Sequence, residues 1–229
     1  MMDETKWVSR RALLDFLMEA HTYFSCQQLL FLTSTIIDRY LHTRLEVLCE
    51  GQQQLYACAA LILAAESRKS NSPNIFDIYF YCGGIDIKMS DVENAKISIA
   101  FTLGVGDVAA LDVATVETFL PTMDTFDKFV QLSECSRPVA REVESMTRYI
   151  AEILLFHQKW ATSNPSTIAK TICKITWWVF WDNGDKRIPD EIAEFLPYLR
   201  PPTVALQSRY QHSARRLEEY LHFRGILDI

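Results

Sequence analysis

The stretch of residues 52–65 is apolar on nearly every helical face and is rich in alanine. A helix without a polar face has to be packed on all sides by other elements. A second stretch of this kind covers residues 167–181. The chain therefore has to build two clusters of elements, each around its own central helix.

Apolar residues recur at helical spacing on both sides of these central segments. The 229 residues include only 7 Gly and 8 Pro, a composition that favours helices over a turn-rich β architecture. We predict an all-α protein of two consecutive five-helix repeats, residues 1–120 and 121–229. The helices expected around the central ones cover residues 7–24, 29–41, 74–81 and 107–119, then 124–132, 139–156, 191–196 and 203–223.

Residues 85–106 fit two different structures. The apolar residues at 85, 87 and 89, and again at 97, 99 and 101, alternate as in a β-hairpin. The run Ser90-Asp91-Val92-Glu93 also resembles a helix capping box, and Val92, Ala95 and Ile99 share one helical face. A short hairpin and an extra helix both stay open for this insertion.

Charge and cysteine usage exclude several classes of function. Lys and Arg number 23 against 29 Asp and Glu, so the net charge of -6 provides no basic footprint for nucleic acid. The longest apolar run, residues 55–65, is too short to span a membrane. The six cysteines are scattered among apolar residues, so we expect reduced core cysteines of an intracellular protein.

No arrangement of side chains predicts catalysis, a metal or a cofactor. The histidines and cysteines lack the spacing of metal ligands, and no nucleophile stands with a base. Residues 103–109 contain the outline G-x-G-x-x-A of a dinucleotide loop, but no βαβ unit surrounds it. We therefore expect a protein that is not an enzyme.

Four ordered motifs resemble the cyclin family. Residues 9–19, SRRALLDFLME, resemble the opening cyclin-box helix MRAILVDWLVEV, and IDRYL at 37–41 resembles the IDRFL of the second helix. Residues 54–65 are similar to the third helix, LQLVGxAAxLLASK, and Pro121-Thr122 with Phe126 match the PTxxxF that opens a second box. The resemblance covers residues 7–223 and implies two cyclin boxes.

The resemblance implies a function in cell-cycle control. Cyclins are regulatory subunits that bind a cyclin-dependent protein kinase and stabilise its active conformation. The expected location is the nucleus and cytoplasm of a eukaryotic cell. A second interpretation is a cyclin-fold adaptor that binds peptides without activating a kinase.

The same resemblance places a kinase-binding surface at the ends of the third and fifth helices. Glu66 stands where the family has a lysine, and basic residues follow it where cellular cyclins have acids, as in gammaherpesvirus cyclins. If residues 90–103 form the fifth helix, Glu66 faces Lys96; if residues 107–119 form it, Glu66 faces Asp112. The expected kinase-binding residues are Glu66, Arg68, Lys69, Lys96, Ile99 and Asp112.

Two further sites follow from the family pattern. Arg10 and Asp38 match a buried ion pair with a structural role. A docking patch for Arg-x-Leu peptides of substrates or inhibitors would comprise Ser9, Ala12, Leu13, Phe16 and Gln54. Because apolar stripes on helices usually face the core, Leu13 and Phe16 as core residues are the alternative interpretation.

Overall fold

The computed structural model describes residues 4–24, 27–44, 48–68, 75–81, 87–104, 137–157, 163–182, 184 and 187–226. Within these ranges the elements are helices and there is no strand, which confirms the predicted all-α class. The chain divides into two compact units, Met1–Val113 and Ala114–Ile229. The helices expected at 107–119 and 124–132, and the boundary expected after residue 120, lie outside the described residues and stay predictions.

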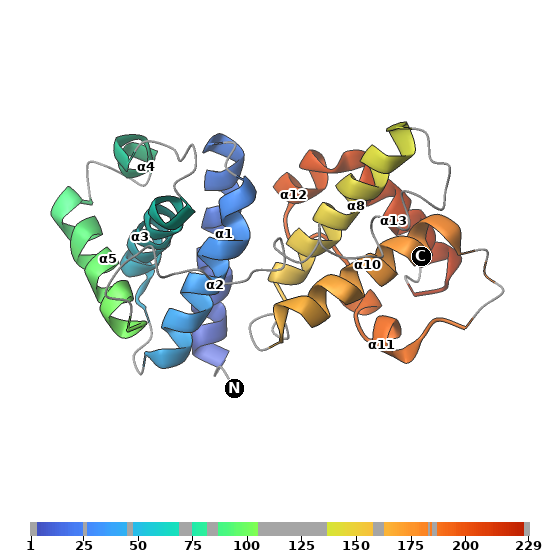
Figure 1. The fold of residues 1–229 in the computed structure, drawn as a ribbon, viewed down its shortest axis with the longest axis horizontal. Coiled ribbons are helices and arrows are strands. Elements are labelled where there is room, and N and C mark those ends of the chain that lie inside the picture. Colours follow the sequence, from blue (N-terminus) through green and yellow to red (C-terminus); the bar gives the residue numbers. More distant parts are fainter. Residues whose placement is uncertain are drawn as a thin grey trace. The chain divides into compact units, whose positions relative to one another are not determined.

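The first unit is built around one helix. Its elements are α1 (Glu4–Phe24), α2 (Gln27–Thr43), α3 (Glu50–Arg68), α4 (Ile75–Tyr81) and α5 (Met89–Thr102). In Figure 1, α3 runs through the middle of this unit, and it packs against each of the other four helices. Residues 57–65 are all buried. These contacts and this burial confirm the prediction of a central helix. Its small alanine side chains let the surrounding helices approach closely.

The ambiguous segment forms the helix α5, and the hairpin interpretation is wrong for residues 89–102. The helix begins after Lys88, whose backbone amide donates to the Asp91 carboxylate at 3.3 Å. Val92, Ala95 and Ile99 are buried at helical spacing, and α5 packs against α3. Gly104 follows the helix with a φ of 67°, in the left-handed region that glycine adopts at helix ends.

The second unit is also all-helical in its described part. Its elements are α8 (Arg137–Leu155), α10 (Pro165–Trp181), α11 (Asp190–Ala193), the 3₁₀ turn η2 (Leu196–Tyr198), α12 (Val204–Arg209) and α13 (Gln211–Phe223). The side chain of Asn164 caps α10 by accepting from the amide of Ser166 at 2.9 Å. The central position predicted for α10 is reflected in its contacts with α8, α11 and α13. Trp178 is buried, whereas Trp177 and Trp181 are half-buried.

The helix predicted at residues 203–223 is broken at Tyr210, between α12 and α13. The break allows two consecutive residues to reach one carboxylate, that of Glu152 in α8. Arg209 Nη1 lies 3.0 Å from Glu152 Oε2, and the Tyr210 hydroxyl donates to Glu152 Oε1 at 2.7 Å. Neighbouring residues in a regular helix point in different directions, so an unbroken helix would not aim both at the same group.

The cysteines differ from the expectation of reduced core residues at two positions, Cys49 and Cys58. Cys49 is exposed and Cys173 is buried, and both are free thiols. Cys58, in the centre of α3, is disulfide-bonded, so the prediction of six reduced cysteines is wrong there. In the described part of the chain, no cluster of His, Cys, Asp or Glu could hold a metal ion, and no helix is both long and apolar enough to cross a membrane.

Candidate functional site

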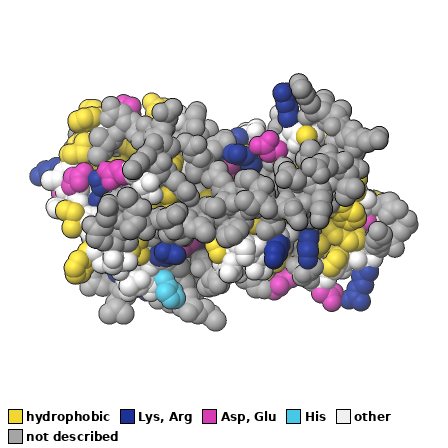
Figure 2. Space-filling view, in the orientation of Figure 1, with side chains coloured by type: hydrophobic (Ala, Val, Ile, Leu, Met, Phe, Trp, Pro, Cys, Tyr) yellow, Lys and Arg dark blue, Asp and Glu magenta, His cyan; other side chains and the backbone are white. Residues whose placement is uncertain are grey.

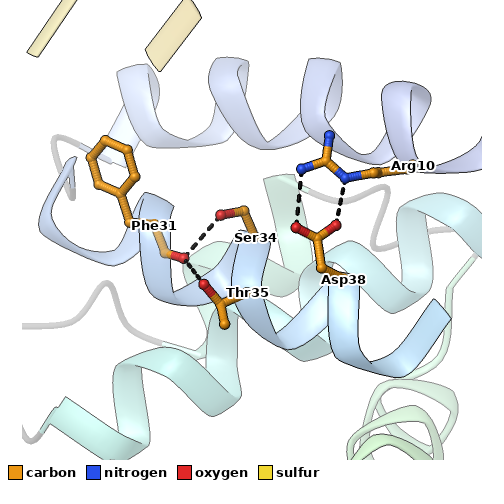
Figure 3. Close-up of polar contacts among 5 residues, drawn as sticks. All are labelled: Arg10, Phe31, Ser34, Thr35 and Asp38. Atoms are coloured by element: carbon orange, nitrogen blue, oxygen red, sulfur yellow. Dashed lines mark hydrogen bonds and ion pairs between the residues drawn. The ribbon is translucent and has the colours of Figure 1, made fainter. Parts of the chain in front are cut away.

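A buried ion pair joins α1 to α2 and fixes these two helices against each other. Arg10 Nε lies 2.5 Å from Asp38 Oδ1, and Arg10 Nη2 lies 3.0 Å from Asp38 Oδ2 (Figure 3). The structure thus makes the expected contact between these residues. Because both side chains are buried, removal of either would leave an uncompensated charge in the core. The pair therefore acts structurally.

Polar side chains of α2 beside this pair are satisfied within the helix. The hydroxyls of Ser34 and Thr35 both donate to the carbonyl oxygen of Phe31, at 2.9 Å and 2.8 Å (Figure 3). A hydroxyl that bonds to the preceding turn of its own helix can be buried without a hydrogen-bond partner from another element. The α1–α2 contact is thus held by the Arg10–Asp38 pair and by apolar packing.

The ends of α3 and α5 meet through a cross-helix ion pair. Lys96 Nζ donates to Glu66 Oε1 at 2.6 Å and to Glu93 Oε1 at 3.3 Å. The Lys96 side chain is 12% exposed, whereas that of Glu66 is 42% exposed. The structure therefore brings Glu66 to Lys96, the first of the two registers considered. Asp112 and Lys69, and the side chain of Arg68, lie outside the described residues.

An exposed stripe on α5 lies beside this pair. Glu93, Ile97 and Phe101 are spaced four residues apart on one helical face, and Ile97 and Phe101 are 64% and 86% exposed. We call these three residues the α5 stripe. Figure 2 shows hydrophobic side chains mixed with acidic and basic ones over the region of α4 and α5. Sequence reasoning missed Ile97 and Phe101, although their spacing was a readable signal.

Ile99, by contrast, was expected on the kinase-binding surface but lies in the core. It is 1% exposed and packs in the core with Val92 and Ala95. A side chain in this position cannot contact a partner protein directly. The kinase-contact role expected for Ile99 is therefore corrected, and the residue instead holds α5 on α3.

A network of aromatic and polar groups connects α2, α3 and α5. The rings of Tyr40 and Tyr56 stack with centroids 5.1 Å apart, and Arg44 Nη1 donates to the Tyr40 hydroxyl at 2.5 Å. The hydroxyls of Tyr40 and Ser98 lie 3.4 Å apart. Burial raises the pKa of Tyr56, but hydrogen bonds to Tyr40, Ser98 and Arg44 outweigh it, so this pKa is lowered. The network fixes α5 relative to α2 and α3.

The residues expected to form a peptide-docking patch are divided between core and surface. Ser9 and Leu13 are buried, as the core interpretation predicts for Leu13. Ala12 and Phe16 are half-buried, and Gln54 is exposed. The surface available to a docking peptide is therefore limited to the last three of these residues.

Phe16 belongs to an aromatic cluster that sequence reasoning missed. Its ring centroid lies 5.9 Å from that of Tyr81 in α4. Tyr81 also contacts Tyr23 and Phe24, at centroid distances of 4.9 Å and 5.2 Å. Rings at these distances and tilts attract one another. The cluster fixes the end of α1 against α4.

Comparisons with known proteins agree with the helices and motifs of the first unit. Residues 1–105 match the family described as Cyclin, N-terminal domain. The chain is 29% identical over 181 residues to the G1/S-specific cyclin CCN1 of Candida albicans, covering 75% of this chain and 26% of that protein. It is 26% identical over 168 residues to the G2/mitotic-specific cyclin-4 of the same organism, covering 73% of this chain and 31% of that protein. The chain thus spans less than a third of the length of these relatives. Over residues 1–105 the chain is thus similar to the N-terminal domain of cyclins.

Proposed function

We propose that this chain is a regulatory cyclin that binds a cyclin-dependent protein kinase and stabilises its active conformation, and so controls cell-cycle progression. The observation that carries the proposal is the Glu66–Lys96 pair, which lies beside the exposed α5 stripe. Resemblance to the family supports this choice, because the kinase contact is expected on this surface. The names of the relatives, which refer to the G1/S and G2/mitotic stages, support a role in the cell cycle.

The chemistry of the surface suits a helix or loop of a partner protein. Burial of Ile97 and Phe101 by a partner would contribute about 1.5–3 kcal/mol for each side chain. The half-exposed Glu66 carboxylate presents an acceptor, where the lysine of other cyclins presents donors. A partner that makes these contacts only in its active conformation is shifted towards that conformation.

Co-purification with a panel of cyclin-dependent kinases tests this proposal. We expect at least one kinase to form a stable complex and to phosphorylate histone faster when this chain is bound. The matched control is Ile97→Glu, which places a charge at the centre of the stripe and is expected to abolish the complex. A complex without a gain in phosphorylation would favour the cyclin-fold adaptor, and the absence of any complex would overturn the kinase proposal.

A role in substrate docking is a separate part of the proposal. Phe16 and Gln54 are the accessible residues of the expected patch that have large side chains. Arg-x-Leu peptides should therefore bind weakly, through contacts with Phe16, and Phe16→Ala should remove this binding. Equal peptide affinities for wild type and Phe16→Ala would show that the patch is not used.

A further inference from the structure

We propose that the second unit carries a peptide-binding pocket, distinct from the α3–α5 surface, that accepts an apolar side chain next to an acidic residue of an extended peptide. The pocket is a cavity of about 340 Å³ bounded by α8, residues 199–207 and α13. Its apolar lining includes Leu199, Ala214, Leu217 and Leu221. All of its lining residues lie in the second unit, so the proposal does not depend on kinase binding.

The hydroxyl of Tyr149, on the wall of this cavity, has no hydrogen-bond partner among the residues that the structure describes. Tyr149 in α8 is 1% exposed, and its ring packs against Tyr210 with centroids 5.4 Å apart. Its hydroxyl makes no hydrogen bond with any described residue, and the oxygen is not sealed within the core. A hydroxyl that opens on a cavity and has no described partner is free to donate to a ligand there. A peptide carbonyl would accept from this hydroxyl.

The rim supplies a guanidinium that pairs with no described residue. Arg200 lines the cavity, is exposed and forms no ion pair with a described residue. Several other arginines of the unit are paired, such as Arg215 with Glu219 at 2.8 Å. The planar guanidinium fork binds a carboxylate through two parallel hydrogen bonds. Arg200 is therefore the group that would select an acidic residue.

Glu218 determines at which end of the pocket the acid would lie. Glu218 also lines the cavity, and burial together with this carboxylate raises the pKa of Tyr149 to about 12. A second carboxylate at the Tyr149 end would be repelled. The peptide acid would therefore lie towards Arg200, with the peptide backbone at Tyr149.

The size of the cavity favours a peptide over a cofactor. Pockets that enclose a complete small molecule range from about 300 to 1,000 Å³, so this one lies at the lower limit. An apolar side chain and its neighbouring backbone match such a volume. The buried leucines would surround the side chain while the charged rim remains in water.

Binding of short labelled peptides to the full chain tests the proposal by fluorescence anisotropy. The probes have a fixed central leucine and carry aspartate, asparagine or lysine at the flanking positions. We expect the aspartate peptides to bind best, and Arg200→Glu to reverse the preference towards lysine. The control Arg141→Glu, at an exposed position of α8 outside the cavity lining, should leave the preference unchanged.

Tyr149→Phe separates a ligand-binding role of the hydroxyl from a structural one. We expect peptide affinity to fall about three- to tenfold, with no decrease in the thermal unfolding temperature, because the hydroxyl bonds to no described residue. A loss of thermal stability in Tyr149→Phe, or an unchanged preference in Arg200→Glu, would overturn the proposal. So would the absence of peptide binding, or binding of N-acetylaspartate as tight as that of the peptides.

Discussion

Lys96 of α5 donates to Glu66 of α3 at 2.6 Å, and the same ammonium group contacts Glu93 one turn earlier at 3.3 Å. Two carboxylates thus surround one cation that is largely shielded from water. Glu66 keeps much of its surface exposed, so it can bond to a partner without leaving Lys96. Relative to the family pattern, this pair has its charges exchanged between the two helices.

The exchanged pair predicts the effect of Glu66→Lys. Two ammonium groups would then face each other, and the surface would present donors in place of an acceptor. We expect kinase affinity to fall at least tenfold, and the free energy of unfolding to change by less than about 1 kcal/mol because the pair is partly exposed. Adding Lys96→Glu to this variant should restore the contact between α3 and α5 and recover part of the affinity. Unchanged kinase affinity in the single variant would contradict the role given to Glu66.

The α5 stripe predicts a loss of binding without a loss of stability. Ile97→Ser and Phe101→Ser remove exposed apolar side chains, so the free energy of unfolding should change by no more than about 0.5 kcal/mol. Kinase affinity, measured by titration calorimetry, should fall at least tenfold in each variant. Val8→Ser, which changes another exposed apolar residue in α1, is the matched control and should bind as wild type.

Ile99→Ala should show the reverse behaviour. Because Ile99 lies on the buried face of α5, its truncation should lower the free energy of unfolding by about 2–5 kcal/mol. At a temperature where the variant remains folded, its kinase affinity should stay close to that of wild type. A large loss of affinity in the folded variant would restore Ile99 to the binding surface.

Much of the first unit could be predicted from its sequence because its central helix is so apolar. Residues 52–65 were predicted to form a helix packed on all sides, and α3 is buried in this way over residues 57–65, whereas Gln54 is exposed. For α5, periods of two and of 3.6 residues both matched the apolar positions over a short run. Packing of Val92, Ala95 and Ile99 in the core selects the helix, and such packing cannot be derived from a local pattern.

The candidate site was predictable where a motif fixed the position of a residue. Arg10 and Asp38 were paired by the family resemblance and are in contact, and of the two partners left open for Glu66 the structure has Lys96. The break at Tyr210 was not predicted, because it depends on Glu152, which lies 58 residues away in sequence. Local periodicity carries no information about such a distant partner.

The buried pair of Arg10 and Asp38 predicts that replacing one partner destabilises the protein more than replacing both. Asp38→Asn leaves the Arg10 guanidinium without a compensating charge in the core, so the free energy of unfolding should fall by about 3–5 kcal/mol. Replacing both residues, as Arg10→Met with Asp38→Leu, should cost less than either single change. Urea denaturation measures these values.

A surface arginine next to the pair provides the control for this experiment. Arg39 follows Asp38 in α2 and is exposed, so Arg39→Met should change the free energy of unfolding by less than about 0.5 kcal/mol. Equal effects of Arg39→Met and Asp38→Asn would show that the buried pair contributes no more than a solvated charge does.

The contact between Tyr210 and Glu152 predicts a pH-dependent effect of Tyr210→Phe. Burial raises the pKa of Glu152, while the Tyr210 hydrogen bond and the charges of Arg209 and Arg148 lower it in part. The variant loses one of these lowering contributions, so the Glu152 pKa should rise further. At neutral pH the loss of a bond to a charged acceptor should cost about 1.5–3 kcal/mol.

The sign of the pH dependence follows from proton binding in the two states. Because the folded-state pKa of Glu152 is raised, its contribution to stability is fully present below the ordinary value of 4.5 and is lost as the pH rises through the folded value. Tyr210→Phe enlarges this loss, so it should destabilise the protein more at neutral pH than below pH 4.5. Urea denaturation at both pH values measures the difference, with Tyr198→Phe, at an exposed tyrosine of the same unit, as the control. An effect of Tyr210→Phe that is equal at both pH values would mean that the hydroxyl does not stabilise the ionised carboxylate, and that the helix break serves another contact.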